Sequence, residues 1–205
     1  MRFDVKKLFR PKEKKRTLII AGLGNPGEKY EKTYHNMGYG AIDALSLLYG
    51  VKVKRAECSS LTAAVNDGGV RVILAKPITY MNLSGQAVKS LLRKYDAGIE
   101  DLIVVYDDAD LTRFALRARQ GGSAGAHKGM KNIVETLGRD DFKRIRIGIG
   151  KEEGDIKDYV LSAVKKEDQS RFEECFKKVA RSVKDYVGHK DYERLMRELN
   201  SKENK

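Results

Sequence analysis

Short apolar runs along the chain are separated by longer segments in which apolar residues recur every three or four positions. The runs at 18–24, 71–75 and 102–106 are typical of strands buried inside a sheet. A fourth segment, 144–150, alternates apolar with polar residues and predicts a half-buried strand. The pattern therefore predicts four short strands distributed along most of the chain.

The segments with helical spacing predict four helices. The first spans 37–48 and is stopped by Gly50, the second is capped by Ser84, and the third covers 130–137 and is ended by Gly138. A longer helix follows, with apolar residues at Phe172, Phe176, Val179 and Val183. Strands that alternate with helices predict a single α/β domain with a twisted mixed, largely parallel sheet flanked by helices.

The composition excludes several classes of protein. With 205 residues, 41% hydrophobic and 34% charged, the chain can form one packed domain and is not of low complexity. No apolar run approaches the roughly 18 residues of a membrane helix, so we expect no membrane association. Cys58 and Cys175 are too few for a disulfide scaffold or a cysteine-only zinc site, which favours a reducing, cytoplasmic location.

The charge says more about function, because it is unevenly distributed. Lys and Arg outnumber Asp and Glu by 41 to 29, which gives a net charge of +12. Residues 1–16 and residues 112–146 each contribute +6, and the remainder sums to zero. A polyanion such as nucleic acid is the natural partner of such segments, and a solvated basic surface is the alternative.

The first 16 residues, MRFDVKKLFRPKEKKR, are interpreted as a flexible basic arm outside the core. They lack the apolar centre of a secretory signal. An organelle-targeting segment is the alternative, against which Asp4 and Glu13 speak. We expect the folded domain to span 17–200 and residues 201–205 to form a frayed tail.

The first strand runs into Gly22-Leu-Gly-Asn-Pro-Gly27, which has the glycine spacing of a dinucleotide-binding loop. That loop functions only where a helix begins at it, because the helix N-terminus binds the pyrophosphate. Here Pro26 and Gly27 predict a turn, and residues 27–36 have no apolar helical stripe. We therefore expect no nucleotide cofactor, and a nucleotide-dependent oxidoreductase is disfavoured.

Polar residues that can carry chemistry follow the ends of two strands. Asn25 follows the first strand, His35 comes ten residues later, and Asp107 directly follows the run at 102–106. An Asp that orients a His makes it a general base, so we predict that His35 and Asp107 meet above the sheet. No G-x-S-x-G nucleophile motif is present, so the His would activate water directly. Metal binding is the alternative, although no H-E-x-x-H spacing supports it.

A third polar loop, 77–85, also follows a strand. It contains Asn82, whose side-chain amide can donate to a carbonyl oxygen or contact a backbone amide. Helix capping by Asn82 or Ser84 is the alternative interpretation. Ligand binding and helix capping both require a polar side chain in this loop, so both interpretations stay open.

A fourth loop, 120–129, is rich in glycine and lies inside the second basic segment. Arg117 and Arg119 precede it and Lys128 lies within it. Backbone N–H groups together with these positive charges suit a phosphate-bearing ligand. The alternative is a mobile surface loop.

These four segments, taken in order, closely resemble the bacterial-type peptidyl-tRNA hydrolase family. The matching stretches are GLGNPGEKYEKTYHNMG (22–38), KPITYMNLSGQAV (76–88), YDDADL (106–111), and RQGGSAGAHKGMKNIVETLG through FKRIRIGIG (119–150). The resemblance covers residues 17–162, and four motifs in the family's order are far more specific than any one alone. The C-terminal helix matches only in kind, and the basic arm has no counterpart.

The resemblance implies a peptidyl-tRNA hydrolase-like fold and ester hydrolysis. Members release the peptide from peptidyl-tRNA that has dropped off the ribosome, which recycles the tRNA. By position, His35 would be the base that activates water, Asp107 its orienting partner, and Asn25 the residue that distinguishes blocked from free aminoacyl ends. The resemblance implies no metal and no cofactor, tRNA and not DNA as partner, and a monomeric chain.

Further positions match substrate-binding residues of the family. The acceptor-end and peptide groove would be lined by Tyr30, Tyr80 and Asn82. The tRNA phosphates would be contacted by Arg117, Arg119 and Arg146. Contacts of the second kind supply affinity without reading sequence.

The chain departs from the family's usual motifs at three places. Tyr34 replaces an Arg before the base, Thr112-Arg113-Phe114 replaces a Pro-x-Gly turn, and Lys128 replaces the Asn of a His-Asn-Gly motif. An Asn amide donates and accepts, whereas an ammonium only donates and is charged. We predict that Lys128 supplies the lost donor and a phosphate or oxyanion contact. We also predict that its charge lowers the pKa of His35 and keeps the base free at neutral pH.

Two classes of function therefore stand after the sequence has been read. An active hydrolase is favoured by the joint presence of His35, Asp107 and Asn25. A non-catalytic RNA-binding relative that retains the groove is the alternative, which the Lys128 loop and the basic arm favour. Release of an N-blocked amino acid from tRNA separates the two.

Overall fold

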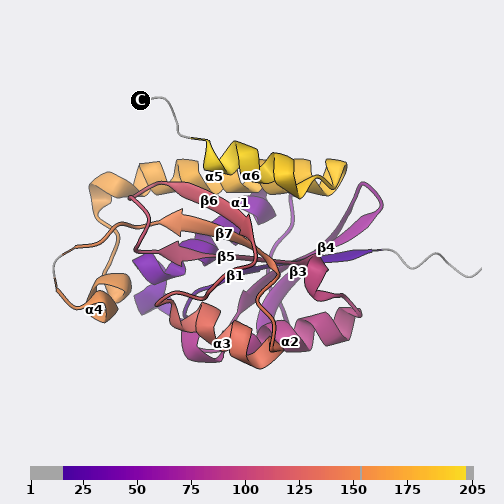
Figure 1. The fold of residues 1–205 in the computed structure, drawn as a ribbon, viewed down its shortest axis with the longest axis horizontal. Helices are drawn as coiled ribbons and strands as arrows, with labels where there is room; N and C mark the ends of the chain where they lie inside the picture. Colours follow the sequence, from indigo (N-terminus) through magenta and orange to yellow (C-terminus); the bar gives the residue numbers. More distant parts are fainter. Residues whose placement is uncertain (1–15, 153, 202–205) are drawn as a thin grey trace, which may run out of the picture.

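A seven-stranded mixed sheet forms the centre of the molecule, and helices cover both of its faces (Figure 1). The computed structural model describes residues 16–152 and 154–201. The predicted basic arm, apart from Arg16, and the predicted tail, apart from Ser201, lie outside the described residues. The α/β class and the flanked mixed sheet predicted from the hydrophobic pattern are confirmed.

The sheet has the strand order β2-β3-β4-β1-β5-β7-β6. The four strands from β4 to β7 in this order are parallel, and the outer strands β3, β2 and β6 pair antiparallel. The strands are β1 (Thr17–Gly22), β2 (Arg55–Glu57), β3 (Ser60–Asp67), β4 (Val70–Pro77), β5 (Leu102–Asp108), β6 (Leu116–Gln120) and β7 (Lys143–Gly148). The carboxyl ends of the parallel strands therefore share one edge of the sheet.

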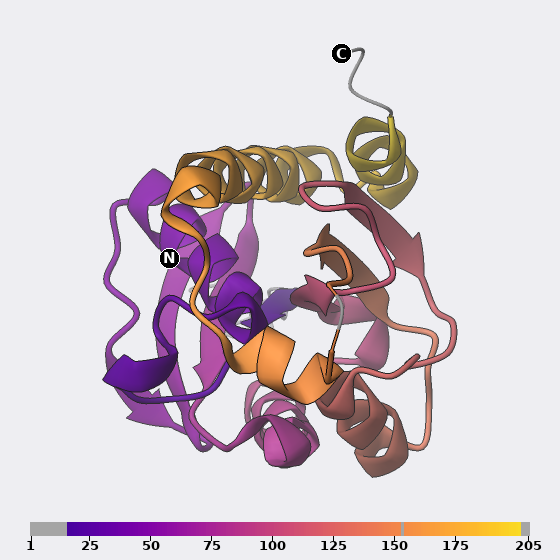
Figure 2. The same cartoon turned by 90° about the vertical axis from the view of Figure 1, so that its left-hand side faces the viewer.

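The helices divide between the two faces. One face is covered by α1, α5 and α6, and the other by α2 and α3, while α4 lies at the edge where the parallel strands end (Figures 1 and 2). They are α1 (Met37–Leu48), α2 (Ser84–Tyr95), α3 (Lys128–Leu137), α4 (Ile156–Leu161), α5 (Lys166–His189) and α6 (Tyr192–Asn200). Within the described ranges, no helix has both the length and the apolar character needed to cross a bilayer.

The predicted helix boundaries hold at two ends and fail at a third. Gly138 follows α3 in the left-handed conformation with φ 66°, and Gly50 lies just beyond α1 with φ 64°. Ser84 does not cap α2, because it is the first helical residue and its hydroxyl donates to the carbonyl of Met81. Leu83 occupies the capping position without a side-chain hydrogen bond, so neither Asn82 nor Ser84 acts as a cap.

Two glycines bring α1 unusually close to the sheet. A Cβ on Gly38 would lie 2.3 Å from the amide nitrogen of Leu23 and 2.3 Å from the carbonyl oxygen of Val105. A Cβ on Gly22 would lie 2.2 Å from the carbonyl oxygen of Gly38. Backbone therefore packs on backbone, which only glycine permits. This contact brings the residues just before α1 to the carboxyl ends of β1 and β5.

The strand at 144–150 is not half-buried as predicted. In β7 the side chain expected to face solvent, Arg144, has 0% exposure. β6, which the hydrophobic pattern did not predict, pairs with β7, and the loop after β6 folds over the polar face. The guanidinium of Arg144 donates to the carbonyls of Ser123 and Asp140, each at 2.8 Å, which compensates part of the cost of its burial, while its Nε has no hydrogen-bond partner among the described residues.

Candidate active site

A cavity of about 720 Å³ lies at the edge of the sheet where β1 and β5 end. Its wall combines the loop after β1, residues 80–82, the end of β5, residues 123–128 and α4. Figure 2 looks onto this edge and shows α4 crossing in front of it. The volume is that of an ordinary small-ligand site, and its position is the one at which open α/β sheets bind ligands.

His35 and Asp107 meet at this cavity. His35 lies in the 3-10 turn η3 (Tyr34–Asn36), and its Nδ1 is 3.0 Å from each carboxylate oxygen of Asp107 near the end of β5. A carboxylate only accepts hydrogen bonds, so Nδ1 carries the proton and Nε2 keeps its lone pair. This is the tautomer that a general base requires.

Asp107 is bound by a second imidazole. Nε2 of His127 lies 3.1 Å from Oδ1 of Asp107, whose exposure is 2%. Burial alone raises the pKa of Asp107, but the charges and hydrogen bonds of His35 and His127 outweigh it and hold that pKa well below its ordinary value. The carboxylate is therefore ionised wherever the protein is folded at ordinary pH.

The hydrogen bonds of His127 also fix its tautomer. Its Nδ1 accepts the backbone N–H of Met130 at 3.1 Å, which caps α3, so its proton is on Nε2 and is donated to Asp107. The ligand atoms of His35, Asp107 and His127 lie within 4.8 Å of one another, close enough to hold a metal ion. Ligation through Nε2 of His127 would move the proton to Nδ1, where it would face the Met130 N–H. The donor set therefore fits a hydrogen-bonded trio better than a metal centre.

The pKa of His35 results from opposing effects. Burial lowers it, whereas the charge and the hydrogen bond of Asp107 raise it, and the net pKa lies above the ordinary value of 6.5. Lys128 acts in the lowering direction, as predicted. The prediction that Lys128 brings the net pKa down is wrong, because Asp107 is in direct contact with the imidazole while Lys128 is exposed to solvent.

Asn25 is held by its backbone and by its side-chain oxygen. Its N–H donates to Oδ1 of Asn36 at 2.8 Å, and Nδ2 of Asn36 donates to its carbonyl at 3.0 Å. Its Oδ1 accepts the N–H of Met81 at 3.0 Å. Because the acceptor is occupied, the Nδ2 group of Asn25 is the part left to donate to a ligand in the cavity that Asn25 lines.

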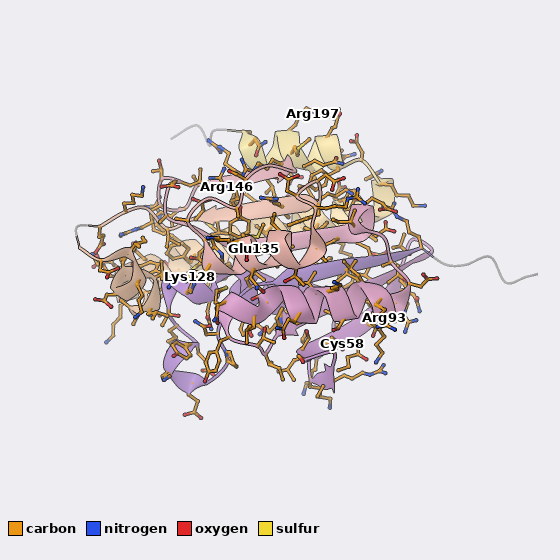
Figure 3. The ribbon with its side chains drawn as sticks, turned by 60° about the horizontal axis from the view of Figure 1, so that its bottom comes forward. Cys58, Arg93, Lys128, Glu135, Arg146 and Arg197 are labelled. Carbon is orange, nitrogen blue, oxygen red and sulfur yellow. The ribbon has the colours of Figure 1, made fainter. Side chains whose placement is uncertain are left out.

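The remaining predicted groove residues all line the same cavity. Tyr30 lies in the turn η2 (Glu28–Tyr30), and Tyr80 and Asn82 lie in the loop after β4. Tyr80 is 59% exposed, so its ring is available to a ligand. Lys128 begins α3 and points from the end of that helix nearest α4, whereas Arg93 lies at the far end of α2 (Figure 3).

Two of the three predicted arginines line the cavity. Arg119 and Arg146 belong to it, and Arg146 is oriented by a 2.6 Å hydrogen bond from its Nε to Oδ2 of Asp108. Arg117 pairs with Arg146 across β6 and β7 but does not line the cavity, and its guanidinium donates to the carbonyl of Leu116. Arg117 thus extends the basic face beyond the cavity.

Two residues at this site were not singled out from the sequence. His127 was visible as one of three histidines, but only the folding of its loop onto β5 brings it to Asp107. Asn36 follows His35 directly, and that adjacency was the one available signal. Both act on residues that were predicted, namely Asp107 and Asn25.

Comparison with known proteins gives a consistent result. The sequence profile of the family described as peptidyl-tRNA hydrolase matches residues 19–205. The peptidyl-tRNA hydrolase of Bacillus subtilis strain 168 is 41% identical over 187 residues, covering 90% of this chain and 99% of that protein. The one from Alkaliphilus metalliredigens is 44% identical over 170 residues, covering 82% and 92%. The crystal structure of peptidyl-tRNA hydrolase from Acinetobacter baumannii matches with a TM-score of 0.85 and 28% identity, covering 93% of this chain and 98% of that one.

Proposed function

The chain belongs to the peptidyl-tRNA hydrolase family and hydrolyses peptidyl-tRNA, and we propose that His35, oriented by Asp107, is the base that activates the attacking water. One observation carries this proposal. Nδ1 of His35 is bound to a buried carboxylate, which leaves the lone pair of Nε2 for a proton in the cavity. The Asp107 charge stabilises the imidazolium that forms after proton transfer.

The reaction needs only water and this pair. Nε2 of His35 takes a proton from water while the water oxygen attacks the carbonyl carbon of the ester. The bond from that carbon to the ribose oxygen then breaks, and the proton moves from Nε2 to the ribose oxygen. Water is consumed, and a carboxylic acid and a ribose hydroxyl are formed. No metal or cofactor enters these steps.

In this proposal the substrate lies along the edge of the sheet, in an order that follows the strand order. Tyr80 and Asn82 follow β4, Asn25 and Asp107 follow or end the central strands β1 and β5, and Arg146 and Arg119 lie on β7 and β6. The peptide thus lies on the β4 side, the ester at the centre, and the RNA phosphates on the β7 and β6 side. Arg117 extends the phosphate contacts along β6.

Asn25 distinguishes blocked from free aminoacyl ends by the group it offers. Its Oδ1 is occupied by the Met81 N–H, so it presents the Nδ2 donors to the substrate. An acylated amine provides a carbonyl oxygen that accepts such a donor. A free α-ammonium provides donors only, and leaves the Asn25 amide unpaired.

Lys128 supplies the third polar contact in this proposal. Lys128 lines the cavity, and its charge acts on the pKa of His35. A positive charge there stabilises the oxyanion that forms at the ester carbonyl, or a phosphate beside it. Replacing an amide by an ammonium keeps the donor and adds charge.

The proposal extends to the whole chain. The catalytic domain spans 17–200, and the chain acts as a monomer in the cytoplasm. Cys58 and Cys175, the two cysteines of the chain, are not joined in a disulfide, which suits a reducing compartment.

Release of an N-acetylated amino acid from tRNA tests the proposed roles. We expect wild type to release it and His35→Ala to lose about 10²–10⁴-fold in kcat. We expect Asp107→Asn to lose at least the same factor in kcat/KM. His189→Ala, which removes a surface histidine 57% exposed, serves as the matched control and keeps full activity. A wild type that binds tRNA but releases nothing would instead indicate the non-catalytic RNA-binding relative.

A further inference from the structure

Arg113 connects three separate parts of the chain behind the cavity. It lies in the connection between β5 and β6, and its guanidinium has four partners. Nη1 donates to Asp168 at 2.9 Å, Nη2 donates to Glu152 at 2.6 Å and to the hydroxyl of Tyr159 at 3.2 Å, and Nε donates to the carbonyl of Ile149 at 3.2 Å. These partners come from the first turn of α5, from the segment after β7 and from α4.

The contact with Tyr159 fixes the wall of the cavity. In α4, Ile156, Val160 and Leu161 line the cavity, while Tyr159 points to the core and is 9% exposed. Its hydroxyl also donates to the carbonyl of Ile149 at 2.6 Å. α4 has only six residues and cannot hold its place by its own hydrogen bonds, so side-chain anchors determine where its cavity face lies.

The same anchor continues to the catalytic base. The ring of Tyr159 packs on that of Tyr34 with centroids 4.7 Å apart, and the Arg113 guanidinium lies 5.8 Å from the Tyr34 ring. The N–H of Tyr34 donates to the carbonyl of Ser162 at 3.3 Å. Tyr34 directly precedes His35 and is 1% exposed, so its position constrains the base.

A backbone connection reinforces this coupling. Thr33 and Ala163 form a bridge, and the N–H of Val164 donates to the carbonyl of Lys32 at 2.7 Å. The segment that follows α4 thus pairs with the segment that precedes His35. Any displacement of α4 is transmitted to both the cavity wall and the base.

We propose that Arg113 is a positioning residue that holds the α4 wall against the cavity and, through Tyr159 and Tyr34, fixes His35. The proposal rests on the proposed function, since it names a residue that supports the same site. Tyr34 occupies a position at which the sequence departs from the family's usual motifs, and Arg113 lies between two others, Thr112 and Phe114.

The test compares three variants of the full chain. Arg113→Met keeps the length of the side chain and removes the guanidinium, and Arg113→Lys restores the charge without the planar fork. Arg139→Met is the matched control, because Arg139 is also paired with a carboxylate, that of Asp141, but is 57% exposed. For N-acetyl-aminoacyl-tRNA we expect Arg113→Met to raise KM and to lower kcat, with a combined loss of about tenfold to a hundredfold in kcat/KM. Arg113→Lys should recover part of the lost kcat/KM, and Arg139→Met should keep the wild-type value.

Backbone hydrogen exchange gives a readout that does not depend on activity. Arg113→Met should speed exchange in residues 32–36 and 156–164 together, while Arg139→Met should leave both at the wild-type rate. Tyr159→Phe keeps the ring on Tyr34 and removes the hydroxyl. If Arg113 acts through Tyr159, the double variant should lose less than the product of the two single losses.

The outcomes separate this proposal from the proposed function. An inactive wild type would contradict the function, and the exchange rates would still decide whether the brace exists. An active wild type together with unchanged kcat, KM and exchange in Arg113→Met would overturn the brace alone. Should Arg113→Met fail to fold, Arg113→Lys and Tyr159→Phe carry the same comparison.

Discussion

At the scale of single residues, the site depends on one carboxylate that serves two imidazoles. Asp107 orients His35, the proposed base, and also raises its pKa, so the group that orients the imidazole also keeps it protonated to a higher pH. Lys128 works against this and recovers part of the free base. The balance is adjustable, because the two charges act on the pKa of one nitrogen in opposite directions.

The pH dependence of kcat/KM reports this balance. The proposed mechanism needs unprotonated His35, so the acid limb should lie above pH 6.5, the ordinary pKa of histidine. Lys128→Met removes a lowering effect and should move the limb to higher pH, while Asp107→Asn removes the raising effect and should move it to lower pH at a much reduced rate. Lys151→Met, which removes another lysine lining the cavity, is the control and should leave the limb in place.

A second variant at this position tests the role of Lys128 in substrate binding. Lys128→Asn restores the residue usual at this position in the family. If Lys128 contacts an oxyanion or a phosphate, Lys128→Asn should change kcat, tRNA affinity or the pH profile. Unchanged values of all three would contradict a functional role for this lysine.

His127 supports the site in two ways that can be measured as stability. It donates to a buried carboxylate and caps α3. His127→Ala should lower the free energy of unfolding by roughly 2–4 kcal/mol in urea at pH 7, from the lost cap and the lost hydrogen bond to a charged group. His189→Ala removes an exposed pair with Asp185 and should cost less than about 1 kcal/mol. Equal effects of the two variants would argue against this role.

At the scale of elements, the close contact between α1 and the sheet determines where the base lies. Gly38→Ala places a Cβ 2.3 Å from two backbone atoms that cannot move independently. We expect a loss of stability of at least about 1–3 kcal/mol and a fall in kcat, because α1 must shift away from Asp107. Gly188→Ala in α5 meets nothing within 4 Å and should stabilise by about 0.5–1 kcal/mol without changing kcat. Thermal unfolding and initial rates measure both.

The strands that could be predicted from the sequence are those whose burial shows directly in their hydrophobic pattern. β1 and β5 are buried on both faces and show it as unbroken apolar runs. β6, with the sequence LRARQ, shows two arginines on one face, which resembles a surface segment until the loop 121–127 covers it. The β2–β3 turn was also not predicted, because Cys58 and Ser59 both have positive φ there, where Asn and Gly are usual.

The residues of the site also differ in how far they could be predicted from the sequence. Asn25 and Asp107 could be predicted because each lies at or just beyond a strand end, and strand ends converge. His35 could be predicted because it is one of three histidines and follows Asn25 by ten residues. The burial of Arg144 and the second hydrogen bond to Asp107 depend on how one glycine-rich loop folds, and its composition leaves many conformations open. The net pKa of His35 could not be predicted either, because its sign depends on distances.

At the scale of the whole molecule, the basic residues at the cavity predict a salt-dependent KM. Each arginine that neutralises a phosphate contributes about 0.7–0.9 to the slope of log affinity against log salt concentration. Arg119→Met should reduce the slope by about that amount and leave kcat at saturating substrate nearly unchanged. Arg93→Met, at the far end of α2 (Figure 3), should not change the slope. Equal slopes for wild type and Arg119→Met would remove Arg119 from the phosphate contacts.

The order of β5, β7 and β6 fixes the distance between the proposed catalytic pair and the basic side chains on β7 and β6. Neighbouring strands lie about 4.8 Å apart, so the basic side chains on β7 and β6 stand at fixed distances from Asp107 near the end of β5, and so from the His35 that it contacts. If Arg146 and Arg119 bind phosphates as proposed, the distance from the ester to the nearest phosphate should decide which esters are substrates more than base sequence does. An ester should bind well when its distance to the nearest phosphate matches this spacing. A blocked aminoacyl adenosine without a phosphate should occupy the ester end of the cavity, make no contact with the arginines, and be cleaved poorly.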